Sequence, residues 1–143
     1  MQAVQIHNGY FLVFERGEEF IPTLVRFCEE NEVHWGQFQA IGAVENVEIG
    51  YYDLPNREYV FRSEPGPFEV ASMDGNITEF NEVPQVHAHA VLSRCDETLE
   101  CLGGHIRSAV VAVTLELCLW QVTQPLLRGY DEDIGLNLIN VTV

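Results

Sequence analysis

Three histidines that lie close together in the chain are the residues best suited to chemistry. His87 and His89 flank Ala88 in a strand-like stretch, and His105 follows after a short acidic turn. In an extended strand, residues two apart point to the same face, so the imidazoles of His87 and His89 project from one surface. Their Cβ atoms would lie roughly 7 Å apart, which is close enough for both rings to bind one ion.

A hairpin between these segments would bring the third histidine to the same face. If residues 96–98 form a three-residue loop, the register places His89 opposite His105. A bulge at Gly103 or Gly104 would turn His105 over, or could be the device that aims it. The sequence therefore predicts a three-histidine metal site, with zinc as the expected ion, or half-buried histidines held by hydrogen bonds.

A carboxylate near such a site could act as a catalytic base. A bound zinc ion with an open position polarises a carbonyl or phosphoryl oxygen and lowers the pKa of its water. The candidate bases are Glu69, Glu116 and Asp74. Glu116 interrupts a strongly apolar strand, so it needs a partner if it is buried, and a structural hydrogen bond is the alternative to a catalytic role.

The charge of the chain bears on its partners. Asp and Glu number 22 against 7 Lys and Arg, and the formal net charge is −15. A surface this negative repels the phosphate backbone that supplies most nucleic-acid affinity, and the cations form no run. Direct DNA binding is therefore doubtful.

The size and the cysteines indicate one ordinary domain in a reducing compartment. The 143 residues are expected to form a single domain over residues 1–143. No stretch is apolar enough to span a bilayer, and the start lacks the pattern of a signal peptide, so a cytoplasmic location is expected. Four cysteines without a Cys-x-x-Cys pair are expected as reduced core or sub-surface residues: Cys28, Cys95, Cys101 and Cys118.

One segment is typical of a helix, and almost everything else is typical of strands. Apolar residues recur at helical spacing from Phe20 to Cys28 and predict a helix over about residues 18–31. The acidic residues at the start of this segment are expected in the first turn of the helix, where the helix dipole favours them. The helix is expected to cover a sheet. Alternation and turn signals predict strands over 4–16, 34–41, 44–53, 58–62, 68–73, the histidine hairpin and 110–120.

Three further expectations follow from this pattern. Gly42 and Ala43 are expected to break the chain between two strands. The acidic residues 131–133 are expected in a solvated turn. The strand over 110–120 is expected to carry one purely apolar face made of Val111, Val113, Leu115, Leu117 and Leu119.

Six short motifs, taken in order, resemble a known family. They are Gly42-Ala43-Val44, Gly50-Tyr51-Tyr52-Asp53, Gly66-Pro67-Phe68-Glu69-Val70, Gly75-Asn76-Ile77, His87-x-His89 and Gly103-Gly104-His105. The ordered set resembles the plants-and-prokaryotes-conserved (PPC) domain, whose members are also described as PD1-like DNA-binding proteins. The similarity spans about residues 17–138.

The resemblance implies an α+β fold, a mainly antiparallel sheet with one principal helix, assembled as a homotrimer. It also implies that histidines equivalent to His87, His89 and His105 hold a metal in bacterial members. In plant members the domain follows AT-hook segments that bind A/T-rich DNA, and the stretch matching residues 66–71 contacts transcription factors. This chain has no AT-hook, and Pro67 stands where the plant motif carries a basic residue.

Two functions follow as hypotheses. The first is a small oligomeric protein with a three-histidine zinc site of unknown activity, whose small-molecule substrate or protein partner is not specified by the sequence. The second is a DNA-associated or protein-binding regulatory module without catalysis. In a third view, the histidines are polar residues at a trimer interface and bind no metal.

Overall fold

The computed structural model describes residues 1–140 of the chain. Within them lie one helix and nine strands: β1 (Gln2–Ile6), β2 (Gly9–Glu15), α1 (Phe20–Glu30), β3 (Gly36–Asp53), β4 (Glu58–Glu64), β5 (Phe68–Phe80), β6 (Val83–Arg94), β7 (Cys101–Gln121), β8 (Leu127–Asp131) and β9 (Leu136–Asn140). The predicted α+β class, with a mainly antiparallel sheet and one principal helix, is confirmed. No helix among these residues is long and apolar enough to cross a membrane.

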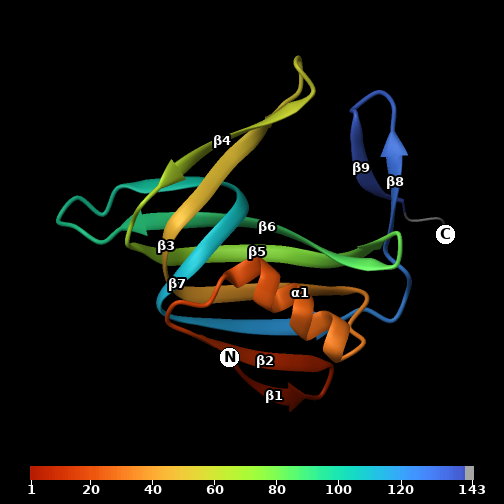
Figure 1. The fold of residues 1–143 in the computed structure, drawn as a ribbon, viewed down its shortest axis with the longest axis horizontal. Coiled ribbons are helices and arrows are strands. Elements are labelled where there is room, and N and C mark those ends of the chain that lie inside the picture. The colour runs from red at the N-terminus through yellow and green to blue at the C-terminus, as the bar shows by residue number, and fades with distance from the viewer. Residues whose placement is uncertain (141–143) are drawn as a thin grey trace.

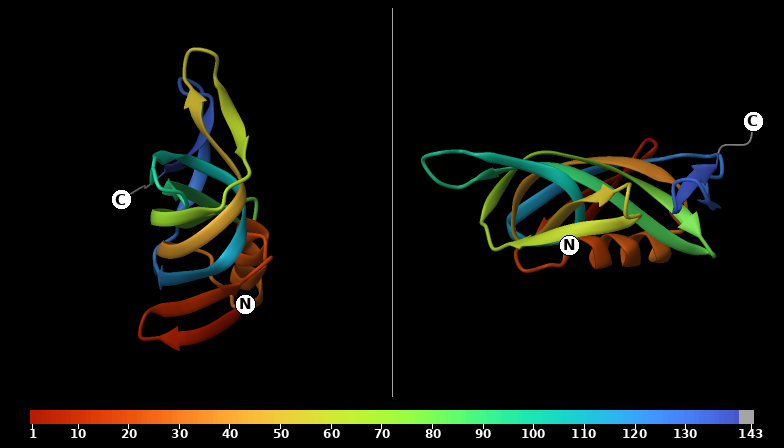
Figure 2. Two further views of the ribbon diagram at one scale, coloured as in Figure 1. Left: turned by 90° about the vertical axis from the view of Figure 1, so that its left-hand side faces the viewer. Right: turned by 90° about the horizontal axis from the view of Figure 1, so that it is seen from above.

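Four long strands form the centre of the fold. Strand β3 pairs with β5 and β7, and β6 pairs with the same two strands, so the antiparallel pairings form a closed circuit. The β1–β2 hairpin extends this sheet along β7, and β4 folds back on the far part of β3. Figures 1 and 2 show the β3–β4 ribbon and the β8–β9 hairpin projecting to the same side of the molecule.

Helix α1 covers the inner face of the sheet. It begins at Phe20 and ends at Glu30, within the predicted range. Phe20 and Leu24 are fully buried, and the Phe20 ring packs edge-on against Phe14 of β2 and Phe38 of β3. Such apolar contacts supply most of the stability of a helix this short.

The prediction that acidic residues occupy the first turn of the helix is wrong, because they precede it. Glu19 is the N-cap residue and makes no capping bond with its side chain. Glu18 instead accepts hydrogen bonds from the Met1 amino group and the Glu15 N–H, both at 2.8 Å. These bonds hold the start of β1 against the end of β2.

The expected break at Gly42 and Ala43 is also wrong, because β3 continues through it. The backbone φ of Gly42 is +144°, and a Cβ at this position would lie 2.2 Å from the carbonyl oxygen of Thr114. Glycine therefore bends the strand and lets β3 and β7 approach closely, where any larger residue would collide. Two predicted strands are in fact one strand of 18 residues.

The expected apolar face of β7 is interrupted. Val111, Leu115 and Leu117 are fully buried, whereas Val113 is 68% exposed. The pairing of β3 with β7 shifts between Gly42 and Val44, so β7 carries extra residues around Val113. This irregularity interrupts the alternation only at Val113, because Val111 before it and Leu115 after it both stay buried.

The cysteines follow the prediction only in part. Cys28 is buried and Cys118 is half-buried, but Cys95 and Cys101 are exposed because they flank the loop of the β6–β7 hairpin. All four are free thiols. The predicted sub-surface position is therefore wrong for Cys95 and Cys101.

Candidate metal centre

The β6–β7 hairpin has the register that the sequence predicts. His89 lies opposite His105, and this pairing continues from Ala88–Ile106 to Ser93–Cys101 without a shift. The connecting loop covers residues 95–100 and is therefore longer than the predicted residues 96–98. Because no bulge interrupts this ladder, the three imidazoles share one face of the sheet.

The three rings converge on one point. One ring nitrogen from each of His87, His89 and His105 lies within 4.8 Å of the other two. The Nε2 atoms of His87 and His89 are 3.1 Å apart, and the ring centroids are 4.9 to 5.4 Å apart. Among residues 1–140, this is the only group of at least three metal-ligating side chains that meets this distance criterion.

The opposite face of the hairpin explains why the three histidines stay on the outer face of the sheet. Ala88, Ala90 and Ile106 alternate with the histidines and are buried in the core. Sliding either strand by one residue would expose these apolar side chains and bury the imidazoles. At Gly104 a Cβ would lie 2.5 Å from the carbonyl oxygen of Gly50, so glycine is needed for β7 to approach β3 beside His105.

Aromatic side chains from β4 form one wall of the site. The Tyr59 ring lies 4.8 Å from the His105 ring and the Phe61 ring 5.8 Å from it, measured between centroids. Both belong to the β3–β4 ribbon, where Gly50 pairs with Phe61 on one side and with His105 on the other. The ribbon therefore restricts the His105 ring and shields it partly from water.

The environment favours neutral imidazoles, the form that binds a metal. Partial burial, with smaller contributions from the charges of the other two histidines and Arg128, lowers the pKa of His105 to about 4. Burial also lowers the pKa of His87, and the positive charges of His89 and Arg128 add to that effect. At neutral pH both rings therefore offer a free lone pair to a cation.

Arg128 and the β8–β9 hairpin are parts of the site that the sequence interpretation missed. This tail was expected to contain a solvated turn of acidic residues. Glu132 and Asp133 do lie exposed in the turn between β8 and β9, whereas Asp131 ends β8 and is half-buried. The hairpin brings Arg128, Asn137 and Leu138 to a cavity that His87 and His105 also line. No local sequence signal shows that Arg128 reaches the histidines. Its position follows from the parallel pairing of β8 with β5.

Of the three candidate bases, the structure brings one close to the histidines. Asp74 pairs with His89 across the β5–β6 ladder and lines the same hollow. Its carboxylate accepts hydrogen bonds from Gln39 Nε2 and Ser72 Oγ, both at 2.9 Å. Glu69 and Glu116 are exposed, and neither lines a hollow that contains one of the three histidines.

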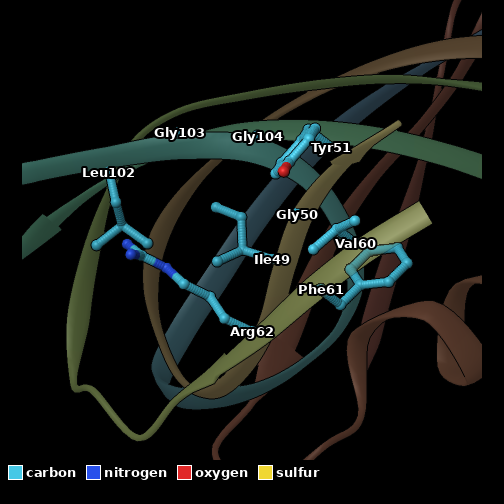
Figure 3. Close-up of a pocket in the computed structure, with 9 residues that line it drawn as sticks. All are labelled: Ile49, Gly50, Tyr51, Val60, Phe61, Arg62, Leu102, Gly103 and Gly104. Atoms are coloured by element: carbon cyan, nitrogen blue, oxygen red, sulfur yellow. The ribbon is translucent and has the colours of Figure 1, made fainter. Parts of the chain in front are cut away.

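A separate hollow of about 270 Å³ contains none of the histidines. Ile49 and Tyr51 of β3 line it together with Leu102 of β7 and Arg62 of β4, as Figure 3 shows. On strand parity, Ile49 and Tyr51 lie on the side of β3 opposite to Gly50, the residue that pairs with His105. The candidate aromatic residue Tyr51 therefore lines a hollow distinct from the histidine site.

The residues present fit a zinc-type ion. Three imidazoles are a common ligand set for zinc, and they leave the fourth tetrahedral position open. Within the described residues, His105 Nδ1 is buried and has no hydrogen-bond partner, so this site holds a polar atom that an ion or an ordered ligand could satisfy. A metal held here would act as a Lewis acid and would lower the pKa of bound water.

The fold is shared with several solved structures. A metal-containing protein from Archaeoglobus fulgidus is 31% identical, with 99% of this chain and 100% of that chain covered and a TM-score of 0.84. A plant- and prokaryote-conserved protein from Pyrococcus horikoshii is 27% identical, with coverages of 94% and 92% and a TM-score of 0.83. A proposed DNA-binding protein from Bacteroides thetaiotaomicron is 24% identical and shows the same fold, with coverages of 97% and 96% and a TM-score of 0.91.

The family is shown by the sequence match. No curated protein matches the chain. The model of one family matches residues 1–123, which include the helix, the three histidines and the strands that position them. The motifs identified in the sequence analysis lie within this range. The chain belongs to the family of the Plants and Prokaryotes Conserved (PCC) domain.

Proposed function

We propose that the chain binds one zinc ion through His87, His89 and His105 and keeps one coordination position open. The observation that carries this proposal is the convergence of three ring nitrogens within 4.8 Å of one another. The lowered pKa values of His87 and His105 support it, because a proton then competes with the metal only in acid. The similarity to a protein described as metal-containing adds support.

The open position makes a Lewis-acid role the natural use of the ion. Tyr59 and Arg128 border the histidines on one side, and Asp74 lies beside His89 on the other. Arg128 can orient an anionic group, and the Asp74 carboxylate is the base candidate favoured by this placement. Glu69 and Glu116 are less favoured because they line no hollow with the histidines.

Elemental analysis of untagged protein tests the metal proposal. We expect about one zinc per chain, and less than about 0.1 per chain after His87, His89 and His105 are all replaced by alanine. His34→Ala is the matched control, since His34 is an exposed histidine whose Nδ1 pairs with Glu79 Oε2 at 2.9 Å. Equal metal in the triple variant and the wild type would disprove the ligand assignment.

The homotrimer implied by the resemblance is retained as a proposal. Support comes from an apolar face that no described residue covers: Phe11 is 39% exposed, Ile41 59% and Trp120 38%. Their register on β2, β3 and β7 places them on the same side of the sheet. Exposed apolar patches of this kind mark association surfaces.

Light scattering tests the trimer. The wild type should have three times the mass of one chain, and Ile41→Asp should lower the measured mass. A monomeric wild type would disprove the proposal.

A DNA-associated or protein-binding role without catalysis is the second candidate. It rests on the resemblance and on structural neighbours described as DNA-binding. The charge opposes direct DNA binding, since Arg94 pairs with Glu64 and Arg107 with Glu48, so both cations are already neutralised. Absence of a gel shift at low salt would remove DNA as a direct partner.

A cytoplasmic location is also retained as a proposal. It is supported by four free thiols, of which Cys95 and Cys101 are exposed and would be open to oxidation in an oxidising compartment. Fractionation of cells that produce the protein tests this location. Recovery outside the cytoplasm would contradict it.

A further inference from the structure

The tail hairpin places a rigid, positively charged group beside the histidines. Arg128 Nε donates to Thr78 Oγ1 at 2.7 Å, Nη1 donates to the Asn137 carbonyl oxygen at 2.8 Å, and Nη2 donates to Asn76 Oδ1 at 3.3 Å. Thr78 is fully buried, and Asn76 pairs with His87 across the β5–β6 ladder. Three bonds to the sheet and to β9 therefore fix the plane of the guanidinium relative to the histidines.

Unlike Arg94 and Arg107, Arg128 has no carboxylate partner among the described residues. Arg94 pairs with Glu64 at 3.1 Å, and Arg107 forms two hydrogen bonds to Glu48. Among residues 1–140 Arg128 forms no ion pair, and its three acceptors are neutral oxygens. A half-buried cation of this kind carries a desolvation cost that a bound anion would offset. Of the five N–H groups of a guanidinium, about two remain free for such an anion.

The space next to Arg128 is large enough for a small organic molecule. A cavity of about 300 Å³ is lined by Arg128, His87, His105 and Tyr59. Its apolar walls are Phe80, Val86, Leu136 and Leu138. Ligand cavities of about this volume combine apolar walls with a few polar groups that fix orientation. A ligand with a charged end and a short apolar part matches this lining.

We propose that Arg128 and the β8–β9 hairpin complete a binding site for a small carboxylic acid next to the three-histidine centre. The carboxylate would be held by the guanidinium, and a further donor atom of the same molecule would reach the open position of the metal. This inference rests on the proposed metal site. A monoanionic carboxylate suits one guanidinium in a chain of net charge −15 better than a dianionic phosphate does.

The test uses protein loaded with Co²⁺, whose visible spectrum changes when a ligand enters its coordination sphere. Metal stoichiometry is measured first. If the wild type takes up no Co²⁺, the proposed metal function fails and this inference with it. If Co²⁺ binds, 2-hydroxybutanoate is titrated, and a saturable spectral change is expected.

The Arg128→Gln variant should bind the same amount of Co²⁺ but require roughly 10- to 100-fold more 2-hydroxybutanoate, because a charge-assisted bidentate pair is lost. Arg16→Gln is the matched control, since Arg16 is exposed in the turn that follows β2 and belongs neither to the β8–β9 hairpin nor to the lining of the cavity. This control should titrate like the wild type. Equal apparent affinities for Arg128→Gln and the wild type would overturn the proposal while leaving the metal site intact.

A comparison of ligands on the unchanged chain keeps the proposal testable if Arg128→Gln fails to fold. The neutral amide 2-hydroxybutanamide has the same shape without the charge and should bind at least roughly 10-fold more weakly. Inorganic phosphate should also bind more weakly than 2-hydroxybutanoate. An amide or phosphate that binds as tightly as the acid would overturn the assignment to a carboxylate.

Discussion

The two faces of the β6–β7 hairpin differ although they alternate along the same strands. On the inner face, Ala88, Ala90 and Ile106 are buried in the core. On the outer face, His87, His89 and His105 converge with one ring nitrogen each. The inner face specifies the register through burial of apolar surface, and the outer face inherits its geometry from that register. The core therefore positions a polar site that does not need to stabilise the fold.

The largest effect on folding is expected from the inner face. Leu92 of β6 lies on the same face as Ala88 and Ala90 and is fully buried. Leu92→Ala should lower the free energy of unfolding by about 2–5 kcal/mol, because it removes buried apolar surface and leaves a cavity. Urea denaturation of the metal-free protein measures this change. A loss below about 1 kcal/mol would show that this part of the core collapses around the gap.

An intermediate effect is expected from the acid titration of His105. Its pKa is about 4 in the folded chain and close to 6.5 when unfolded, so between these values the unfolded state binds more protons. Stability from this group is therefore complete above pH 6.5 and is lost as the pH falls toward 4. Since the ring is partly exposed to solvent, we expect a loss of about 1 kcal/mol.

His105→Gln removes this titration and serves as its comparison. The difference in the free energy of unfolding between the wild type and His105→Gln is measured in urea at pH 7, 5.5 and 4.5 with a chelator present. Carboxylates titrate in both proteins, so the difference isolates the histidine. A difference that does not change with pH would contradict the lowered pKa.

The smallest effect on folding is expected from His89, which is exposed. His89→Ala should change the free energy of unfolding of the metal-free protein by less than about 0.5 kcal/mol. With zinc present, the same variant should lose most of the stabilisation that bound metal supplies to the wild type. Thermal unfolding with and without zinc measures both. A large loss in the metal-free protein would make His89 a structural residue.

The match between prediction and structure depends on whether a feature is local. Helix α1 and the register of His89 with His105 follow from periodicity and from a short loop, and both were predictable. Two other features were not predictable: the continuity of β3 through Gly42 and the exposure of Val113. Both depend on how closely β3 and β7 approach each other. Tertiary pairing overrides a local break signal when the glycine is needed for contact.

The candidate bases illustrate the same limit. The sequence offered Glu69, Glu116 and Asp74 without a way to choose between them. The register of β5 with β6 places Asp74 opposite His89 and leaves Glu69 opposite Ser93. Glu116 projects to the exposed side of β7. Strand pairing distant in the sequence makes this selection, and periodicity alone does not carry that information.

The sequence by itself determined the outline of the three-histidine site, through the two-residue spacing of His87 and His89 and the hairpin that adds His105. It also determined the acidic composition that opposes DNA binding. These are properties of one strand, one turn and a sum of charges. Only the tertiary structure decided what surrounds the centre. Arg128 reaches it because β8 joins β5 beside buried Thr78, a contact between segments 50 residues apart. Such contacts follow from the packing of the whole core, which no local pattern encodes.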